Sequence, residues 1–296
     1  MTPTFAGLIP PMISPLLPNG DIDTTGLSAH VDRLISGGVD GLFVLGTSGE
    51  GPLLDLARAQ QVIAKTVAAA AGRVPVLAGV LEPSTPRTVE AARIAADCGA
   101  DAVVATTPYY VEADDDGIRD HFLQLADRSP LPLILYNIPS KTHHVLTPDM
   151  VAEMVDHPNI VGMKDSHGDW TAFERLLALR RPGFTLLQGA EQLCARSILA
   201  GADGLVPGLG NVVPRLFMNI LRSAKTGDAD AALAYQAQAD ALGKLHSYGH
   251  WLACLKYATS RIGLTHPDTF ASASPLSDAA RAAIDALVDA RQGDTV

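Results

Sequence analysis

Short apolar runs alternate with amphipathic stretches along the first three quarters of the chain. The apolar runs predict eight strands, at 7–13, 41–45, 74–80, 102–106, 132–136, 160–164, 185–188 and 204–206. Between them, apolar residues recur at helical spacing, which predicts helices near 24–36, 55–71, 84–97, 115–127, 147–155, 170–180 and 190–200. Nearly continuous apolar strands that alternate with helices are typical of a parallel sheet covered by helices.

Eight such units in about 225 residues predict a closed (β/α)₈ TIM barrel. The alternative is an open doubly wound sheet that binds a nucleotide, which favours a glycine-rich fingerprint after the first strand. The chain has Pro15-Leu16-Leu17-Pro18-Asn19-Gly20 at that place, which is not such a fingerprint. The barrel is therefore the favoured fold.

The pattern after Pro214 is helical only, with predicted helices at 214–225, 228–246, 248–262 and 276–291 and a loop at 265–274. The first of these helices would close the barrel. The others would form a C-terminal helical extension packed against it. The predicted domains are a barrel at 1–226 and the extension at 227–296.

The charge balance excludes some classes of protein. Lys and Arg number 22 and Asp and Glu 32, so the net charge is −10, whereas a nucleic-acid-binding surface is basic. Charged residues make up 18% of the chain, against a usual ~25%, which suggests much buried surface and subunit contacts.

The cysteines and the N-terminal segment indicate a soluble, cytoplasmic protein. Cys98, Cys194 and Cys254 lie far apart with no C-x-x-C pair, so neither a disulfide framework nor a zinc site is expected. The first charged residue is Asp21, but residues 1–20 contain five prolines and no basic start. That segment is neither a signal peptide nor a membrane span.

In a barrel, active-site groups come from the carboxyl ends of the strands and the loops after them. The second predicted strand runs into Gly46-Thr47-Ser48-Gly49-Glu50-Gly51. Its glycines, hydroxyls and backbone N–H groups suit a carboxylate or a phosphate. The alternative is an ordinary glycine-rich turn between strand and helix, in which Ser48 has only a capping role.

The fifth and sixth strands end in groups suited to proton transfer and nucleophilic attack. Tyr136 would place a phenol at the barrel mouth, although an ordinary rim aromatic is the alternative. Strict alternation puts Ile160, Gly162 and Lys164 on one face, and Val161 and Met163 on the face toward the helices. Lys164 would then point into the mouth, where desolvation favours the neutral, nucleophilic amine, and Gly162 would leave room for a substrate. The alternative is a lysine paired with Asp165 or with a nearby carboxylate.

Other strand ends and polar clusters carry weaker signals. The fourth, seventh and eighth strands end at 106–110, 188–192 and 207–211, which are polar or small-residue segments. His143-His144 lacks a third ligand at metal spacing, so we predict no metal site.

Together these strand ends resemble the dihydrodipicolinate synthase/N-acetylneuraminate lyase family of Schiff-base-forming, pyruvate-dependent class I aldolases. The resemblance rests on Gly46-Thr47-Ser48-Gly49-Glu50, Pro108-Tyr109-Tyr110, Tyr136-Asn137-Ile138-Pro139 and Gly162-Met163-Lys164-Asp165, and on the 28 positions from Tyr136 to Lys164. It covers essentially the whole chain, including the helical tail.

The resemblance implies a role for each matching residue. Lys164 would form an imine with the keto carbon of pyruvate or a 2-keto acid, so no other cofactor is needed. Tyr136 would carry protons, and Thr47 and Ser48 would hold the substrate carboxylate. Thr47 would also connect Tyr136 to Tyr110, which in this family reaches into the neighbouring subunit of a homotetramer built as a dimer of dimers. Gly189 and the turn from Gly208 to Asn211 would line the pocket.

The sequence departs from the synthases in the residues that bind the aldehyde. Lys141 stands where synthases carry an arginine, and Asp165-Ser166 stands where they usually have a glutamate. Glu191 falls where sialic acid lyases place a polyol-binding carboxylate. We therefore favour aldol cleavage of a 2-keto-3-deoxy sugar acid, or a related 4-hydroxy-2-keto acid, to pyruvate and an aldehyde.

Three other functions stay open. The first is condensation of pyruvate with aspartate semialdehyde, and the second is N-acetylneuraminate lyase activity. The third is a catalytically silent barrel that binds a ligand, although Lys164, Tyr136 and Thr47 argue against it. All the partners expected are small molecules and further copies of the chain, with no nucleic acid and no membrane.

Overall fold

A computed structural model describes residues 5–264 and 266–295 of the chain. Residues 1–4 and 296 of the predicted domains, and Thr265 of the predicted loop, therefore lie outside the described residues. Eight parallel strands form one sheet in the order β1-β8-β7-β6-β5-β4-β3-β2. They are β1 (Gly7–Leu8), β2 (Leu42–Val44), β3 (Val76–Gly79), β4 (Ala102–Thr106), β5 (Leu133–Asn137), β6 (Ile160–Asp165), β7 (Thr185–Gln188) and β8 (Gly204–Leu205).

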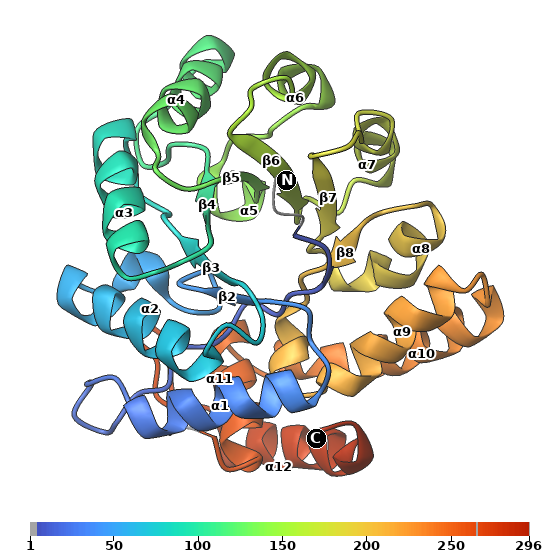
Figure 1. Cartoon of the computed structure of the whole chain (residues 1–296). Helices are drawn as coiled ribbons and strands as arrows, with labels where there is room; N and C mark the ends of the chain where they lie inside the picture. Colours follow the sequence, from blue (N-terminus) through green and yellow to red (C-terminus); the bar gives the residue numbers. More distant parts are fainter. Residues whose placement is uncertain (1–4, 265, 296) are drawn as a thin grey trace.

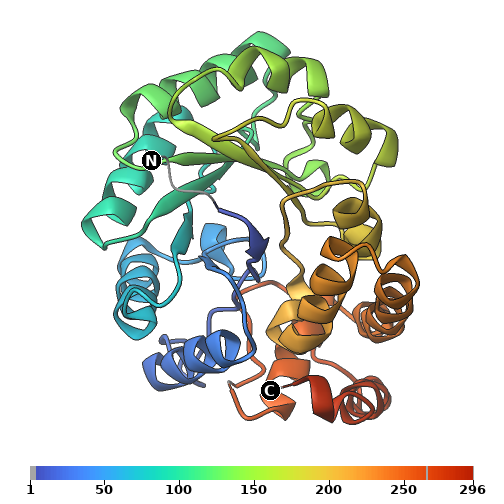
Figure 2. The same cartoon turned by 45° about the vertical axis from the view of Figure 1, so that its right-hand side comes forward.

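Helices surround the strands as a ring, which Figures 1 and 2 show in two orientations, and eight of those in the described residues follow the strands in turn. They are α1 (Thr24–Ser36), α2 (Leu56–Ala70), α3 (Thr85–Asp97), α4 (Asp115–Arg128), α6 (Pro148–Met154), α7 (Trp170–Leu177), α8 (Cys194–Leu199) and α9 (Pro214–Lys225). The short helix α5 (Pro139–Thr142) follows β5 directly. The predicted (β/α)₈ barrel is confirmed.

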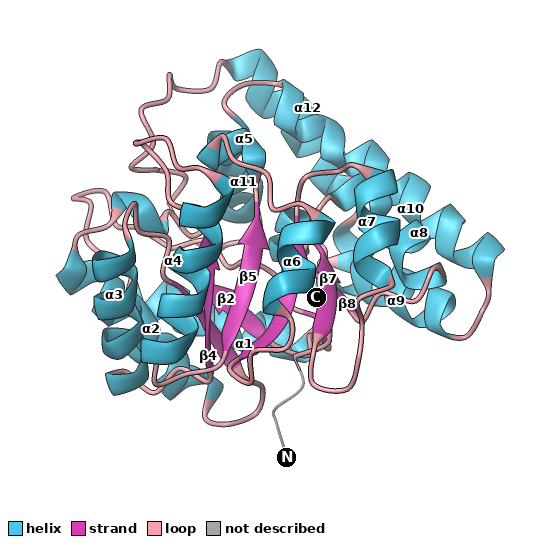
Figure 3. Cartoon of the chain, turned by 90° about the horizontal axis from the view of Figure 1, so that it is seen from above, coloured by secondary structure: helices cyan, strands magenta, loops and turns pink. Residues whose placement is uncertain are grey.

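The C-terminal helices are α10 (Ala229–Gly243), α11 (Trp251–Arg261) and α12 (Asp278–Asp289). Helix α10 packs on α9 and α8, whereas α11 contacts α12 and the turn after β8. Figure 3 shows the strand arrows pointing toward the side on which α5 and α11 lie. The extension therefore reaches the carboxyl ends of the strands, where a barrel carries its active site.

The first strand is much shorter than predicted. It ends at Leu8 because Pro10 and Pro11 have no N–H to donate to a ladder. The chain then crosses to β2, where Phe43 N donates to Pro10 O at 3.1 Å and Met12 N donates to Phe43 O at 2.7 Å. This parallel bridge between Pro11 and Phe43 closes the ring of strands.

Several predicted helices are shorter than the apolar pattern suggested. The segment predicted at 190–200 is a 3₁₀ turn, Glu191–Leu193, followed by α8. The segment predicted at 228–246 ends at Gly243 and continues as a 3₁₀ turn, Lys244–Ser247. Helix α5 was not predicted. These three short segments matter because each carries a residue that reaches the barrel mouth. Glu191 and His246 lie on the two 3₁₀ turns, and Lys141 lies on α5.

Side chains of successive strand residues alternate between the barrel interior and the helices. Ile134 and Tyr136 of β5 join the interior cluster with Phe43, whereas Leu133 and Leu135 pack in the outer core. This two-residue period is the geometry of any strand. Because one face of each strand packs in the barrel interior and the other packs against the helices, an apolar run is buried on both faces here.

Strand β6 breaks the alternation with a β-bulge. Its Ile160 pairs with Leu133, but its Gly162 pairs with Ile134, so Val161 is an extra residue. Val161 therefore joins the interior cluster while Ile160 packs outside, which corrects the strict alternation predicted for this strand.

The role predicted for Gly162 is also corrected. A Cβ at Gly162 would lie 2.6 Å from Thr185 Oγ1 and 2.7 Å from Thr185 O. The glycine thus permits the close approach of β7 to the bulge. It leaves no room for a substrate, because Thr185 occupies that space.

No helix in residues 5–264 and 266–295 is both long and apolar enough to cross a membrane.

We predict that acid destabilises the fold through His30. This residue is fully buried on α1, and its Nε2 lies 2.8 Å from Asn211 Oδ1. Burial, and secondarily Arg33, lower the pKa of His30 from 6.5 to about 3, although the Asn211 contact opposes them. Between pH 6.5 and about 3, His30 is therefore protonated in the unfolded chain but neutral in the folded chain. The stability that is present above pH 6.5 is lost as the pH falls toward 3.

From pH 7 to pH 5 this group alone should cost about 2 kcal/mol of unfolding free energy. Urea unfolding at the two pH values measures the loss. His30→Gln should show a smaller loss than the parent chain, because glutamine does not titrate; an equal loss would contradict the assignment.

Candidate active site

A cavity of about 260 Å³ opens at the carboxyl ends of the strands. Nine of the predicted site residues line it: Thr47, Ser48, Tyr136, Lys141, Lys164, Ser166, Gly189, Glu191 and Gly208. They come from the loop after β2, from β5 and α5, from β6, and from the segments after β7 and β8. The structure thus brings together groups that lie up to 161 positions apart in the sequence (Thr47 to Gly208).

Lys164 is a buried amine that faces two aromatic rings. Lys164 is only 4% exposed. Its Nζ lies 4.0 Å from the centroid of the Tyr136 ring and 5.0 Å from the centroid of the Phe43 ring. Aromatic faces attract an ammonium without offering it a carboxylate. Among the described residues Lys164 forms no ion pair. The amine is therefore available to a ligand in the cavity.

Asp165 does not pair with Lys164. Its Oδ1 accepts a hydrogen bond from Asn137 Nδ2 at 2.6 Å, and Asn137 Oδ1 accepts one from Leu146 N at 3.0 Å. Burial raises the pKa of the Asp165 carboxyl, although the Asn137 contact opposes the rise. The Asp165 carboxylate thus holds the segment after β5 in place through Asn137, and it forms no ion pair with Lys164.

Gly189 gives Lys164 its space. The backbone N–H of Gly189 donates to Asp165 O at 2.7 Å, which holds the end of β7 against β6. A Cβ at this position would lie 2.8 Å from Lys164 Cε and would overlap Ser166 Oγ. Only glycine lets the two strand ends come this close without displacing the lysine.

Tyr136 and Thr47 form the start of a hydroxyl chain beside the amine. Tyr136 is 2% exposed, and its hydroxyl lies 3.4 Å from Thr47 Oγ1. Its ring also packs edge-on against Phe43 at 6.3 Å between centroids. A phenol fixed over the amine and in contact with a second hydroxyl can carry a proton between ligand and protein.

The loop after β2 is held in an unusual backbone conformation. Leu45 and Glu50 have φ values of 56° and 59°, in the left-handed region that most residues avoid. Ser14 Oγ donates to Gly49 O at 2.6 Å. Ser48 lines the cavity and caps no helix, because Asp55 caps α2 by accepting from Arg58 N at 2.8 Å. The alternative role for Ser48 is therefore not seen.

The outer part of the cavity is built from α5 and the C-terminal extension. Lys141 Nζ lies 5.5 Å from the Trp251 ring centroid. Glu191 Oε1 accepts from Leu209 N at 2.7 Å, and Glu191 Oε2 lies 3.7 Å from His246 Nε2. Burial lowers the pKa of His246, but the contacts with Glu191 and with the Trp251 carbonyl together outweigh it and raise this pKa above its ordinary value.

Sequence reasoning missed three residues of this wall, His246, Trp251 and Leu255. They lie in the helical extension, where the rule that places chemistry at strand ends says nothing. The signals were a histidine at the end of one predicted helix and a tryptophan near the start of the next, and neither indicates which way the side chain faces.

Two predicted site residues lie outside the cavity. Tyr110 is 96% exposed, with a φ of 75°. Asn211 is fully buried, and its side chain accepts from Ile13 N at 3.0 Å and donates to Pro11 O at 2.8 Å. Asn211 therefore ties the turn after β8 to the segment after β1, and its amide is engaged by the backbone there and by His30.

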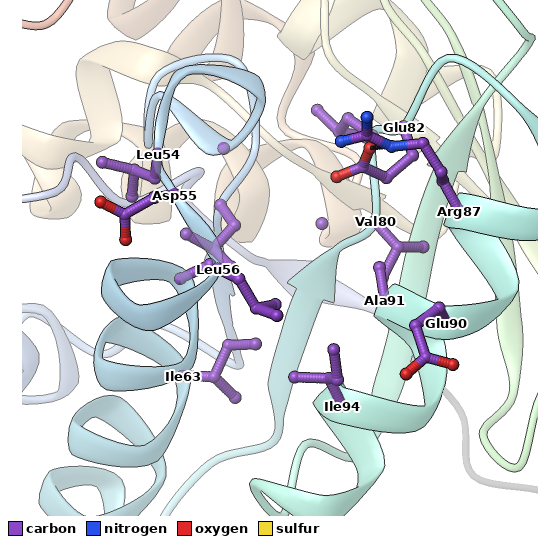
Figure 4. Close-up of a pocket in the computed structure, with 15 residues that line it drawn as sticks. Leu54, Asp55, Leu56, Ile63, Val80, Glu82, Arg87, Glu90, Ala91 and Ile94 are labelled. Atoms are coloured by element: carbon purple, nitrogen blue, oxygen red, sulfur yellow. Dashed lines mark hydrogen bonds and ion pairs between the residues drawn. The ribbon is translucent and has the colours of Figure 1, made fainter.

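The part of the chain that the structure describes contains no group of three or more His, Cys, Asp or Glu residues placed to hold a metal ion. A separate cavity of about 280 Å³ lies outside the strands, between α2 and α3. Figure 4 shows Leu56 and Ile63 of α2 facing Ala91 and Ile94 of α3 across it. None of the predicted site residues lines this second cavity.

Comparison with known proteins agrees with this geometry. The model of the dihydrodipicolinate synthetase family matches residues 4–291. The 4-hydroxy-tetrahydrodipicolinate synthase of Stenotrophomonas maltophilia is 35% identical over 284 residues, which cover 96% of this chain and 95% of that protein. The synthase of the same name from Xylella fastidiosa is 35% identical over 245 residues, covering 83% of this chain and 80% of its own.

The fold has close counterparts among solved structures. YagE, a prophage protein of the dihydrodipicolinic acid synthase family from E. coli K12, was solved in complex with pyruvate. It superposes with a TM-score of 0.92 at 30% identity, covering 97% of this chain and 99% of its own.

We predict that Gly189→Ala lowers the turnover rate about 100-fold without unfolding the protein, because the added methyl group displaces the Lys164 side chain. Steady-state kinetics and a thermal melt measure the two effects. Gly243→Ala is the matched control, since a Cβ there meets only Leu209 Cδ1 at an ordinary 3.8 Å. Full turnover in the Gly189 variant would show that the lysine has more freedom than the structure indicates.

Proposed function

Because the chain belongs to the dihydrodipicolinate synthetase family, whose members are pyruvate-dependent lyases, we propose that Lys164 forms an imine with the keto carbon of pyruvate. One observation carries the proposal. A buried amine with no ion-pair partner among the described residues lies against a tyrosine ring inside the cavity at the strand ends. That is the environment in which a lysine acts as a nucleophile.

The neighbouring groups suit each step. The neutral amine attacks the keto carbon, whose oxygen leaves as water and gives the protonated imine. Loss of a proton from the adjacent methyl carbon then gives an enamine, which adds to an aldehyde; in reverse, the same steps cleave a 4-hydroxy-2-keto acid. Tyr136 carries the protons and passes them toward Thr47, while Thr47 and Ser48 hold the substrate carboxylate. The imine is itself the electron sink, so the reaction uses no metal.

We propose that the substrate is a 2-keto-3-deoxy sugar acid, which the enzyme cleaves to pyruvate and an aldehyde. Ser166, Glu191 and His246 line the same cavity as Lys164 and offer hydroxyl, carboxylate and imidazole partners to a polyol. Lys141 is a single cation on α5 and lacks the fork with which arginine grips a carboxylate.

A second candidate is the condensation of pyruvate with aspartate semialdehyde. It is favoured by the names of the curated relatives, which are 4-hydroxy-tetrahydrodipicolinate synthases at about 35% identity. In this reaction Lys141 would bind the carboxylate of the semialdehyde.

For assembly we propose a homotetramer built as a dimer of dimers. Tyr110 is 96% exposed and Val111 71% exposed, next to each other at the barrel mouth. Two large, exposed apolar residues at one loop suit contact with a second copy. Tyr110 would then reach the partner's hydroxyl chain rather than its own.

We expect pyruvate and borohydride to inactivate the enzyme and to add a reduced pyruvyl mass to the peptide that contains Lys164. Borohydride reduces the imine to a stable secondary amine, so mass spectrometry locates the modified lysine. Lys65→Met is the control for the loss of a lysine, because Lys65 lies on α2, away from the cavity. Lys256→Met is less suitable for this purpose, because Lys256 is buried. Label on another lysine, or no label under conditions that modify a known aldolase, would refute the proposal.

We expect a higher kcat/KM for cleavage of a 2-keto-3-deoxy sugar acid than for condensation with aspartate semialdehyde. Lys141→Arg should shift the ratio toward the semialdehyde by about tenfold, because arginine makes a bidentate, charge-assisted contact with a carboxylate. Both specificity constants are measured on one preparation of each variant. Dominance of the semialdehyde reaction in the unmodified enzyme would establish the second candidate instead.

A further inference from the structure

Behind the loop that carries Thr47 and Ser48 lies a fully buried ion pair. Lys256 of α11 and Glu50 at the end of that loop are each 0% exposed at their side chains, with Lys256 Nζ 2.5 Å from Glu50 Oε1. The pair joins the C-terminal extension to the barrel across 206 positions of sequence. Neither residue belongs to the cavity that contains Lys164.

Both members of the pair make further hydrogen bonds to other segments. Lys256 Nζ donates to Ser14 O at 3.0 Å. Glu50 Oε2 accepts from Thr269 Oγ1 and from Phe270 N, each at 2.6 Å. One carboxylate therefore holds together the segment after β1, the loop after β2, helix α11 and the loop that follows it.

These contacts hold the loop at the residues that face the cavity. Glu50 N donates to Thr47 O at 3.3 Å, which closes the turn containing Ser48. Ser14, whose carbonyl accepts from Lys256, also donates its hydroxyl to Gly49 O at 2.6 Å. The turn is thus held from both sides, and Glu50 keeps its left-handed φ of 59°.

Stability alone does not account for such a pair. Burying two charges costs free energy that their attraction repays only in part, and well-packed apolar residues often serve the fold as well. The position of the pair suggests another role. An uncompensated carboxylate at Glu50 would stand a few residues behind hydroxyls that are to receive an anion, and like charges repel strongly where water is scarce.

We propose that Glu50 and Lys256 are positioning residues for the carboxylate of the 2-keto acid substrate. Glu50 sets the conformation of the Thr47–Ser48 turn, and Lys256 neutralises Glu50 so that the turn accepts an anion. This inference rests on the proposed imine chemistry and adds to it a reason for the helical extension. The extension supplies the counter-charge without which the barrel's own loop would reject the substrate.

The test measures the pyruvate concentration that half-saturates borohydride trapping at Lys164, together with the trapping rate at saturation. In Lys256→Met the half-saturating concentration should rise by about tenfold or more, because a charge-assisted contact is lost and an unpaired carboxylate is left. The saturated rate should change much less, because Lys164 and Tyr136 are untouched. A purely structural role would reduce the amount of labelled enzyme and leave the half-saturating concentration as it was.

Three further variants make the result specific. Glu50→Gln combined with Lys256→Met removes both charges, so it should bind pyruvate better than Lys256→Met alone. Thr269→Val removes one donor to Glu50 and should raise the half-saturating concentration of pyruvate about threefold. If Lys256→Met does not fold, Thr269→Val alone tests the positioning role. Arg261→Met is the matched control, because Arg261 lies on the same helix as Lys256 but forms its ion pair at the surface, with Asp285 of α12.

The outcomes separate this inference from the proposed function. If pyruvate and borohydride label Lys164 in the unmodified enzyme, but folded Lys256→Met or Thr269→Val keeps the original half-saturating concentration, the positioning role is overturned and the imine chemistry stands. If the double variant binds pyruvate no better than Lys256→Met, the neutralising role of Lys256 is overturned. If the unmodified enzyme is not labelled at all, both proposals fall.

Discussion

The arrangement of the site depends on one extra residue in β6. Side chains alternate along a strand, so Lys164 faces the barrel interior only if the count from the start of the strand has the right parity. Ile160 packs outside and Val161 inside, and the bulge then places Gly162 on the inner face with Val161. Without the bulge, Met163 would turn inward and Lys164 would point into the helices.

Two glycines accommodate the bulged strand, one within β6 itself and one directly after β7. Gly162 lets Thr185 of β7 approach, and Gly189 lets the end of β7 pass the Lys164 side chain. Thr185 fills the space beside Gly162, and Ser166 Oγ and Asp165 O fill the space beside Gly189, so Lys164 is crowded on one side and open on the other. A buried amine that faces aromatic rings, with its neighbour Asp165 bonded to Asn137, is the result.

The C-terminal extension is part of the site rather than an addition to the barrel. It contributes Trp251, His246 and Leu255 to the cavity wall, and Lys256 to the loop behind it. Helix α11 therefore contacts the site with one group of residues and holds it in place with another. This arrangement explains why a helix follows the eighth βα unit and packs over the mouth of the barrel.

The sequence by itself determined the class of fold and the set of groups at the strand ends. Periodicity of two and of 3.6 residues is a local property, and alternating strands and helices leave few topologies open, so the barrel could be predicted. The inward Lys164 could be predicted because its apolar neighbour Met163 was taken to face the helices, although the start of the strand was assigned to the wrong faces. Tertiary structure alone decided the bulge in β6, the burial of Asn211, the facing of His246 and Trp251, and the pairing of Glu50 with Lys256. Each of these depends on a contact between segments far apart in sequence, and no local pattern records which distant residue will fill a given space.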